Sequence, residues 1–285
     1  MRIVSYVRPG TSDSASWGFV VGDGIVDHTS VAGAEAATVR DLIAGGVLPD
    51  EAAVEAAAPT VALADVELLP PVEAGKVLCA GVNFPTHREE TGQAPEKPEY
   101  PVIFARFAES HVGHAHDIRR PSETEKFDYE GELAVVIGKR AFRVSEEEAL
   151  DHVFGWSVYN DGSVRDWQRH SPQWIPGKNF WQSGAFGPEI VTAGAVADIG
   201  ASRLQTRVNG EVRQDAFIKD MVFSVAELIA YCSTFTPLNP GDVIAAGTPG
   251  GVGLFFDPPR LLSDGDVVEI EIDGVGLLRN TVRQA

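Results

Sequence analysis

The sequence predicts a mixed α/β, strand-rich protein whose strands form a mixed β-sandwich or roll. Three observations lead to this class. Strand-like segments dominate, no regular alternation of strand, helix and strand appears, and Asn209-Gly210 separates two strand-like runs. The missing alternation argues against a doubly wound parallel sheet, and an Asn-Gly pair between such runs is a strong hairpin signal. With 285 residues, the chain is long enough to bury a substantial core.

The first 71 residues predict a small α/β unit. Arg2–Val7 is typical of a strand, and residues 17–21 and 24–27 predict a hairpin that turns at Gly22-Asp23. Residues 38–43 and 50–58 predict two helices, of which the second is rich in Ala and Glu. Residues 59–71 show no clear period and end in Pro70-Pro71. We therefore expect a domain boundary near residue 72, which divides the chain into 1–71 and 72–285.

The remaining residues predict mostly strands, with two helices whose starts are clear. A serine followed three residues later by glutamate marks the start of each helix, at Ser145 with Glu148 and at Ser224 with Glu227. The alternation of apolar residues and the turn signals predict strands over 76–80, 132–137, 154–160 and 266–272, and a hairpin over 207–212.

Charge and composition exclude several function classes. Lys and Arg number 23 against 41 Asp and Glu, which gives a formal net charge of −18. Such a chain repels phosphate backbones and anionic lipids, so we expect neither nucleic acid nor a membrane as a partner. No apolar run approaches the length that spans a bilayer. Since Cys79 and Cys232 cannot make a disulfide scaffold, we expect a cytoplasmic protein with reduced thiols.

Three carboxylates stand out as metal ligands. Glu130 and Glu132 are two residues apart at the start of a predicted strand, so they point to the same side. Burying both is costly without a cation, and Asp161 follows another predicted strand. Oxygen-only ligands suit Mg²⁺, Mn²⁺ or Ca²⁺ rather than zinc. The plain alternative is a solvated strand end without any ion.

A histidine and a glutamate predict a proton-transfer pair. His87 and Glu90 are three residues apart in a short predicted helix, so they share one face. A carboxylate beside an imidazole orients it and raises its basicity, which suits a general base acting on water. A surface histidine with incidental acidic neighbours is the alternative.

Five stretches together resemble the fumarylacetoacetate hydrolase family over roughly residues 72–281. Each stretch is modest alone, but all five in this order are specific. They are GVNFPTHREE at 81–90, DYEGELAVVIG at 128–138, NDGSVRDWQ at 160–168, PGKNF at 176–180 and GTPGGVG at 247–253.

The resemblance implies roles for the matching residues. The carboxylates Glu130, Glu132 and Asp161 match the metal ligands, which typically hold Mg²⁺, and His87 with Glu90 match the water-activating pair. Lys178 matches the lysine that supports the enolate, while Arg165, Gln168 and Thr248 match positions that line the substrate site. The implied fold is the family's mixed β-sandwich roll with a small N-terminal α/β domain, usually as a homodimer acting on a small oxo acid.

The leading functional hypothesis is metal-dependent hydrolysis of a C–C bond in an acylpyruvate or 1,3-dioxo acid through a metal-bound enolate. Lys178 adds positive charge where negative charge develops, and His87 activates water. The alternative on the same site is a 2-oxo acid decarboxylase or a keto–enol isomerase, neither of which needs activated water. A structural cation site in a non-enzymatic interaction module is the alternative from another class.

Some positions depart from the family pattern. Phe84 stands where Tyr is common, Trp181 where Asp is frequent, and Arg106 where a Lys-Pro pair is common. We expect Arg106 at the substrate, where its planar fork changes how a carboxylate is held. With Trp167 and Trp174, these changes predict a bulkier, more apolar pocket. The histidines of residues 111–116 predict a plain polar loop rather than a metal tract.

Overall fold

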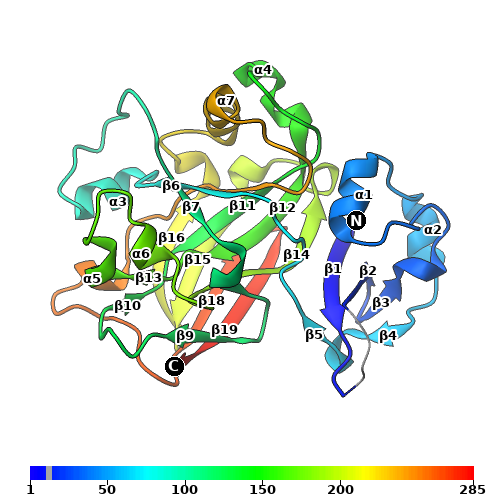
Figure 1. Cartoon of the computed structure of the whole chain (residues 1–285), viewed down its shortest axis with the longest axis horizontal. Helices are drawn as coiled ribbons and strands as arrows, with labels where there is room; N and C mark the ends of the chain where they lie inside the picture. Colours follow the sequence, from blue (N-terminus) through cyan, green and yellow to red (C-terminus); the bar gives the residue numbers. More distant parts are fainter. Residues whose placement is uncertain (11–14) are drawn as a thin grey trace.

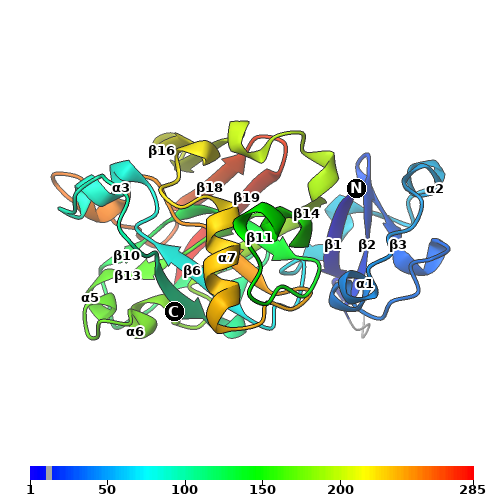
Figure 2. The ribbon, with the colours of Figure 1, turned by 90° about the horizontal axis from the view of Figure 1, so that it is seen from above.

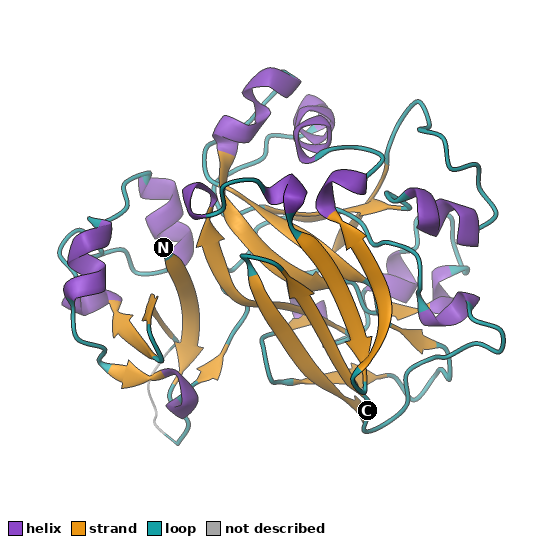
Figure 3. Cartoon of the chain, turned by 180° about the vertical axis from the view of Figure 1, so that it is seen from behind, coloured by secondary structure: helices purple, strands orange, loops and turns teal. Residues whose placement is uncertain are grey.

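A computed structural model describes residues 1–10 and 15–285, and its centre is a pair of β-sheets packed face to face (Figure 1). Strands β11, β12 and β14 of the larger sheet contact β15, β18 and β19 of the smaller one. Figure 3 shows the smaller sheet in front of the larger one when the molecule is seen from behind. Both sheets mix parallel and antiparallel pairs, so the predicted strand-rich α/β class is confirmed.

The larger sheet holds twelve strands of the described residues, in the order β4-β3-β2-β1-β14-β12-β11-β17-β6-β7, with β5 on β1 and β8 on β14. Among the described strands of this sheet, only the pairs β17–β6 and β14–β8 are parallel. The strands are β1 (Arg2–Val7), β2 (Ser16–Val21), β3 (Gly24–Asp27), β4 (Val61–Ala62), β5 (Glu67–Leu68), β6 (Val77–Gly81), β7 (Val102–Arg106), β8 (His111–Val112), β11 (Gly131–Ile137), β12 (Val153–Asn160), β14 (Gly184–Thr192) and β17 (Val243–Ala245).

The smaller sheet has the order β16-β15-β18-β19-β9. The predicted Asn-Gly hairpin is its edge, and Asn209 and Gly210 both have positive φ (52° and 80°), which this tight turn requires. A separate short ladder pairs β10 with β13. These strands are β9 (Asp117–Arg120), β15 (Arg203–Val208), β16 (Glu211–Phe217), β18 (Val267–Ile272), β19 (Gly276–Gln284), β10 (Phe127–Asp128) and β13 (Ser163–Val164).

The two faces of β11 serve different cores. Leu133, Val135 and Ile137 point into the core between the sheets, together with Leu204 and Ile270. Ala134 and Val136 point to the opposite face and join a second core. This alternation follows from the period of two along a strand, and it places the preceding even-numbered residues on the face away from the sandwich.

The N-terminal segment continues the larger sheet. Strand β1 pairs antiparallel with β14, with Ile3 opposite Ile190. Trp17 and Phe19 share the second core with Val136 of β11. The predicted hairpin is confirmed as β2–β3. The division of the chain at residue 72 stays a prediction.

Short helices surround the sheets. Figure 2 shows α3, α5 and α6 at the end of the molecule opposite α1 and α2, whereas α7 crosses the middle. Both predicted helix starts, at Ser145 and Ser224, carry a capping box. No helix of the described residues is long and apolar enough to cross a membrane. The α-helices are α1 (Val39–Gly45), α2 (Glu51–Ala56), α3 (Pro85–Glu90), α4 (Glu146–Ala149), α5 (Arg165–Gln168), α6 (Ile175–Lys178) and α7 (Val225–Phe235).

Short 3₁₀ turns complete the described structure. They are η1 (His28–Ser30), η2 (Leu63–Asp65), η3 (Ala108–Ser110), η4 (Leu150–His152), η5 (Ala193–Ala195), η6 (Ile199–Ala201), η7 (Ile218–Asp220) and η8 (Gly253–Phe255).

Candidate active site

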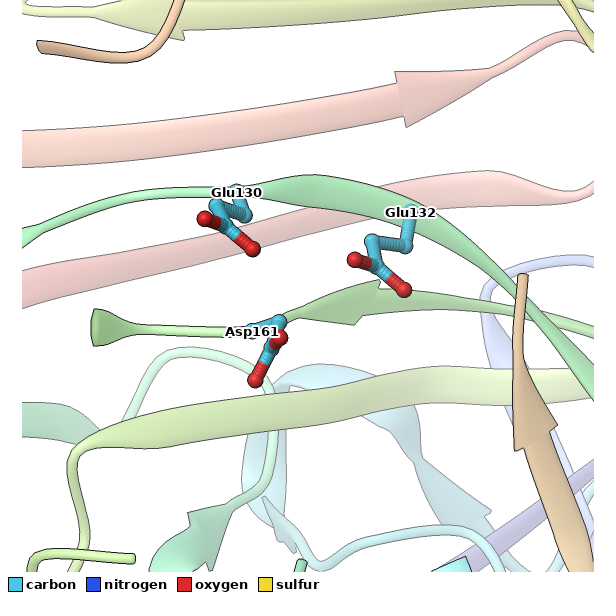
Figure 4. A group of neighbouring side chains, drawn as sticks. All are labelled: Glu130, Glu132 and Asp161. Atoms are coloured by element: carbon cyan, nitrogen blue, oxygen red, sulfur yellow. The ribbon is translucent and has the colours of Figure 1, made fainter. Parts of the chain in front are cut away.

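Three buried carboxylates meet at the end of the β11–β12 pair. Strands β11 and β12 run antiparallel with Glu132 opposite Tyr159. Two residues further along this register, the Asp161 backbone N–H donates to the carbonyl oxygen of Glu130 at 2.9 Å. Figure 4 shows the side chains of Glu130, Glu132 and Asp161 gathered on one side of the two strands. One carboxylate oxygen from each lies within 4.8 Å of the others.

This geometry fits a divalent cation. Hard cations bind oxygen ligands at about 2.0–2.6 Å, so two ligands of one ion lie up to roughly 4–5 Å apart. The donor set contains only carboxylate oxygens, which suits Mg²⁺, Mn²⁺ or Ca²⁺ better than zinc. All three side chains are buried, so solvent does not stabilise their charge.

Three cationic side chains surround two of the carboxylates. Lys178 Nζ donates to Glu130 Oε2 at 2.8 Å and to Asp161 Oδ2 at 2.6 Å. Arg165 Nη1 donates to Glu130 Oε1 at 2.5 Å, and Arg106 Nη1 donates to Asp161 Oδ1 at 2.6 Å. Each carboxylate oxygen has two lone-pair sites, so these contacts leave capacity for an ion. Burial alone would raise the pKa of Glu130, but Lys178 and Arg165 lower it below its usual value.

Glu132 differs from Glu130 and Asp161, because no Lys or Arg side chain of the described residues contacts it. Its Oε2 accepts a hydrogen bond from the Gly247 backbone N–H at 2.9 Å. Burial, followed by the charges of Asp161 and Glu130, raises the pKa of Glu132 well above its usual value. Asp128, which binds Arg165, is a fourth carboxylate, so four acids face three cations. A divalent cation would therefore remove a surplus of negative charge.

Lys178 is positioned by a close contact between two helices. A Cβ atom at Gly177, one residue before it in α6, would lie 2.3 Å from the backbone nitrogen of Gln168 in α5. Only glycine permits this approach, which brings Lys178 and Gln168 to the same wall. The Lys178 ammonium also lies 5.1 Å from the centre of the Phe104 ring.

His87 and Glu90 form the predicted contact. Helix α3 begins at Pro85, a favoured first helical position, and His87 Nδ1 lies 3.1 Å from Glu90 Oε2. Since a carboxylate accepts, Nδ1 carries the proton in this contact, and in the neutral imidazole Nε2 is then the acceptor. Glu90 also accepts from the Gly251 backbone N–H, and Phe255 packs edge-on against the His87 ring.

Asp128 is a site residue that the sequence analysis did not select. Its side chain is fully buried and accepts from Arg165 Nε at 2.8 Å, the Gly253 N–H at 2.8 Å and the Leu254 N–H at 3.0 Å. It thereby joins Arg165 to the turn that carries Phe255. The signal was present, because residues 128, 130 and 132 repeat the same period of two.

A cavity of about 530 Å³ opens over Glu130 and Glu132. Thr248 and Gln168 line it. Thr248 Oγ1 accepts from Gln214 Nε2 at 2.7 Å, and Gln168 Oε1 accepts from Arg165 Nη1 at 3.2 Å. Gln214 is a second residue that the sequence did not reveal. The charged and polar side chains of the cavity wall are His87, Thr91, Gln93, Glu130, Glu132, Arg165, Gln168, Arg169, His170, Ser171, Lys178 and Thr248.

The structure places Arg106 behind Asp161 and not on this cavity. Its guanidinium is fully buried and also donates to Ser110 Oγ, Ser183 Oγ and the Gly162 carbonyl. These protein oxygens occupy the fork that we expected to hold a substrate carboxylate. The geometry makes Arg106 a support for Asp161.

The tryptophans and histidines are dispersed. Trp174 lines the cavity, whereas Trp181 is 62% exposed and Trp167 packs against Phe180. The expected polar loop at residues 111–116 is only partly present, since His111 belongs to β8 and hydrogen-bonds with the Tyr159 hydroxyl. None of the three histidines lies on the wall of this cavity.

Comparison with known proteins supports an enzyme site. Residues 76–283 match the family described as fumarylacetoacetate (FAA) hydrolase C-terminal. The chain is 43% identical to the mitochondrial oxaloacetate tautomerase fahd2 of Xenopus laevis over 221 residues, which cover 76% of this chain and 69% of the relative.

Two solved structures are similar over their full length and over all of this chain. One is a fumarylacetoacetate hydrolase from Exiguobacterium antarcticum (TM-score 0.87, 35% identity). The other is a maleylpyruvate hydrolase from Sphingobium sp. SYK-6 in complex with manganese(II) and pyruvate (TM-score 0.80, 31% identity).

Proposed function

The chain belongs to the fumarylacetoacetate hydrolase family, and from that premise we propose that it is a divalent-cation-dependent enzyme that interconverts the keto and enol forms of a small 2-oxo acid. The observation that carries this proposal is the buried set of Glu130, Glu132 and Asp161, beside a cavity that also contains Lys178 and His87. The similarity to an oxaloacetate tautomerase favours this reaction over the other reactions of the family.

Glu130, Glu132 and Asp161 would hold the ion, which we propose to be Mg²⁺, with Mn²⁺ and Ca²⁺ as alternatives. When bound, such an ion supplies Lewis acidity to the carbonyl group of a 2-oxo acid. It would also convert a cluster with surplus negative charge into one that attracts an anionic substrate.

The protein's own groups move the proton. His87 presents Nε2 as an acceptor, because Glu90 fixes the proton on Nδ1. We assign His87 Nε2 to take a proton from C3 of the keto acid and to return it to the enolate oxygen, so no atom is added or lost overall. Lys178 stays protonated between Glu130 and Asp161 and places positive charge near the developing oxyanion.

A second candidate is hydrolysis of an acylpyruvate-like C–C bond. The contact between His87 and Glu90 favours it, since the same pair suits activation of water. The similarity to a maleylpyruvate hydrolase supports this candidate. A 2-oxo acid decarboxylase on the same site would be recognised by carbon dioxide release.

The decisive experiment measures oxaloacetate enol decay by ultraviolet absorbance, with protein treated with EDTA and then given Mg²⁺, Mn²⁺ or Ca²⁺. We expect loss of activity on chelation and recovery with at least one ion. The same protein preparations are offered acylpyruvates, with pyruvate as the hydrolytic product. Activity that is unchanged after metal removal would overturn the metal-dependent proposal, and an enol decay no faster than the spontaneous one would overturn tautomerisation.

Glu132→Gln separates the metal role from folding. The substitution keeps an oxygen that can accept from the Gly247 N–H and removes a buried carboxyl group that no cation contacts, so metal-free protein should lose no stability, while Mn²⁺ binding measured by calorimetry should weaken at least tenfold. Glu189→Gln is the control, because Glu189 is equally buried on β14 but pairs with Arg2 outside this cavity. Unweakened Mn²⁺ binding by the Glu132 variant would contradict the assignment.

The homodimer and the cytoplasmic location remain predictions. Light scattering on the purified protein would test the first, and fractionation of source cells the second.

A further inference from the structure

The cavity wall carries an arginine without a partner. Arg169 lies on the wall, is exposed, and its side chain forms no hydrogen bond or ion pair with any other residue in the described part of the chain. The other strong cations of the wall, Arg165 and Lys178, bind Asp128, Glu130 and Asp161. Among the described residues of this wall, Arg169 is therefore the arginine whose whole guanidinium group remains available to a ligand.

The charge of the chain makes this arrangement notable. Acidic residues outnumber basic ones by 41 to 23, so carboxylates are abundant as partners for exposed cations. Arg2, Arg203 and Arg207, for example, all pair with carboxylates in the structure. An unpaired arginine beside the cavity is thus not explained by a shortage of acids.

Arg169 is also aligned with the inner part of the site. It is the C-cap of α5, with helical dihedral angles, and it follows Arg165 by four residues. Residues four apart on a helix share a face, and both Arg165 and Arg169 line the cavity. Arg165 Nη2 is buried and has no hydrogen-bond partner, which leaves one donor near the carboxylates.

We propose that Arg169 binds the distal carboxylate of the substrate and so selects 2-oxo dicarboxylates over 2-oxo monocarboxylates. This inference rests on the proposed function, because it takes the 2-oxo end of the substrate to be held at the acidic cluster. An arginine fork matches a carboxylate in charge and in planar geometry. Gln93 and Ser171, on the same wall, add neutral hydrogen-bonding groups.

The kinetic test compares oxaloacetate with 2-oxobutanoate, which has a methyl group in place of the distal carboxylate. In Arg169→Gln, we expect KM for oxaloacetate to rise about tenfold with kcat little changed, because the lost contact binds substrate and transition state alike. The rate of deuterium exchange at C3 of 2-oxobutanoate, followed by NMR, should be the same in this variant as in the wild type. Arg140→Gln is the control, since Arg140 is exposed outside the cavity and its loss changes the net charge equally.

The binding test needs no turnover. Calorimetry with Mg²⁺-loaded protein compares malate with 2-hydroxybutanoate, the unreactive hydroxy analogues of the two substrates. We expect the wild type to bind malate more tightly, and Arg169→Gln to remove that preference while 2-hydroxybutanoate binds as before.

The outcomes separate the two proposals. A tautomerase whose oxaloacetate KM and malate affinity are unchanged in Arg169→Gln would overturn the inference and leave the proposed function standing. A protein without tautomerase activity that still shows the Arg169-dependent preference for malate would overturn the proposed function and leave the role of Arg169 in carboxylate binding standing. Equal losses for both members of each pair would also overturn the inference, because they would show a general effect on the site.

Discussion

At the scale of the residue, the site depends on side chains that hold other side chains in place. Asp128 accepts hydrogen bonds on both carboxylate oxygens, from Arg165 and from the turn of η8. Arg165 in turn donates to Glu130, and the turn carries Phe255 to the His87 ring. A change at Asp128 is therefore transmitted to both the metal ligands and the proton-transfer pair.

Asp128→Asn should lower kcat/KM by about 10- to 100-fold, because the amide nitrogen would face a donor on whichever side it turns. Steady-state kinetics measure the effect. Asp242→Asn is the matched control, since Asp242 is as buried and accepts from Lys76 and Asn239, but does not line the cavity. The control should lose stability and keep its kcat. Similar kinetic losses in both variants would reduce Asp128 to a purely structural role.

At the scale of the element, the approach of α6 to α5 controls the placement of Lys178. Gly177→Ala introduces a Cβ atom that would lie 2.3 Å from the backbone nitrogen and 2.4 Å from the Cα of Gln168, so the helices must separate. We expect kcat/KM to fall at least about tenfold, since small displacements of catalytic groups are costly.

Gly45→Ala is its control, because Gly45 is also helical but has open space around its Cβ position. That variant should keep its activity and gain up to about 1 kcal/mol of stability. Full activity of the Gly177 variant would show that the contact can relax without moving Lys178.

The N-terminal hairpin contains a second feature at this scale, a carboxylate that is held by several hydroxyl groups. Asp27 at the end of β3 accepts hydrogen bonds from the hydroxyl groups of Tyr6, Ser16 and Thr29. Burial alone would raise the pKa of Asp27, but the hydrogen bonds from Thr29 and Tyr6 lower it well below its usual value.

Because the folded state lowers this pKa, its stabilising effect is complete above the unfolded value near pH 4 and is lost as the pH falls further. Asp27→Asn should therefore destabilise the protein at pH 7, by about 1–3 kcal/mol. Urea unfolding from pH 7 to pH 2.5 should show the difference from wild type shrinking below pH 4. A difference that is constant with pH would exclude the ionised carboxylate as its cause.

At the scale of the whole molecule, the N-terminal segment covers a strand edge and an apolar face that residues 72–285 would otherwise expose. Strand β1 pairs with β14, and Trp17 and Phe19 pack in a core with Val136 and Phe186. A chain that starts at residue 72 would leave the edge of β14 and that apolar face open to water.

We therefore expect the fragment 72–285 to aggregate, or to unfold at a markedly lower temperature than the whole chain. Size-exclusion chromatography and thermal unfolding followed by circular dichroism would measure this. A fragment with native Tm and a single sharp elution peak would show that the boundary near residue 72 separates two independent folding units.

The sequence by itself determined the strand-rich class, the hairpins at residues 17–27 and 207–212, the helix starts at Ser145 and Ser224, and the common face of Glu130 and Glu132. All of these follow from local turn chemistry, capping and periodicity, which depend on neighbours in the chain. The same motifs were specific enough to predict the family.

Only the tertiary structure decided which strands are neighbours. The register of β11 on β12 brings Asp161 beside Glu130, the paired ladder β10–β13 brings Arg165 to Asp128, and Arg106 is directed at Asp161 and not at the cavity. These contacts join residues 31 to 55 positions apart. Their geometry depends on the pairing and register of strands that lie far apart in the sequence, and no local pattern determines either.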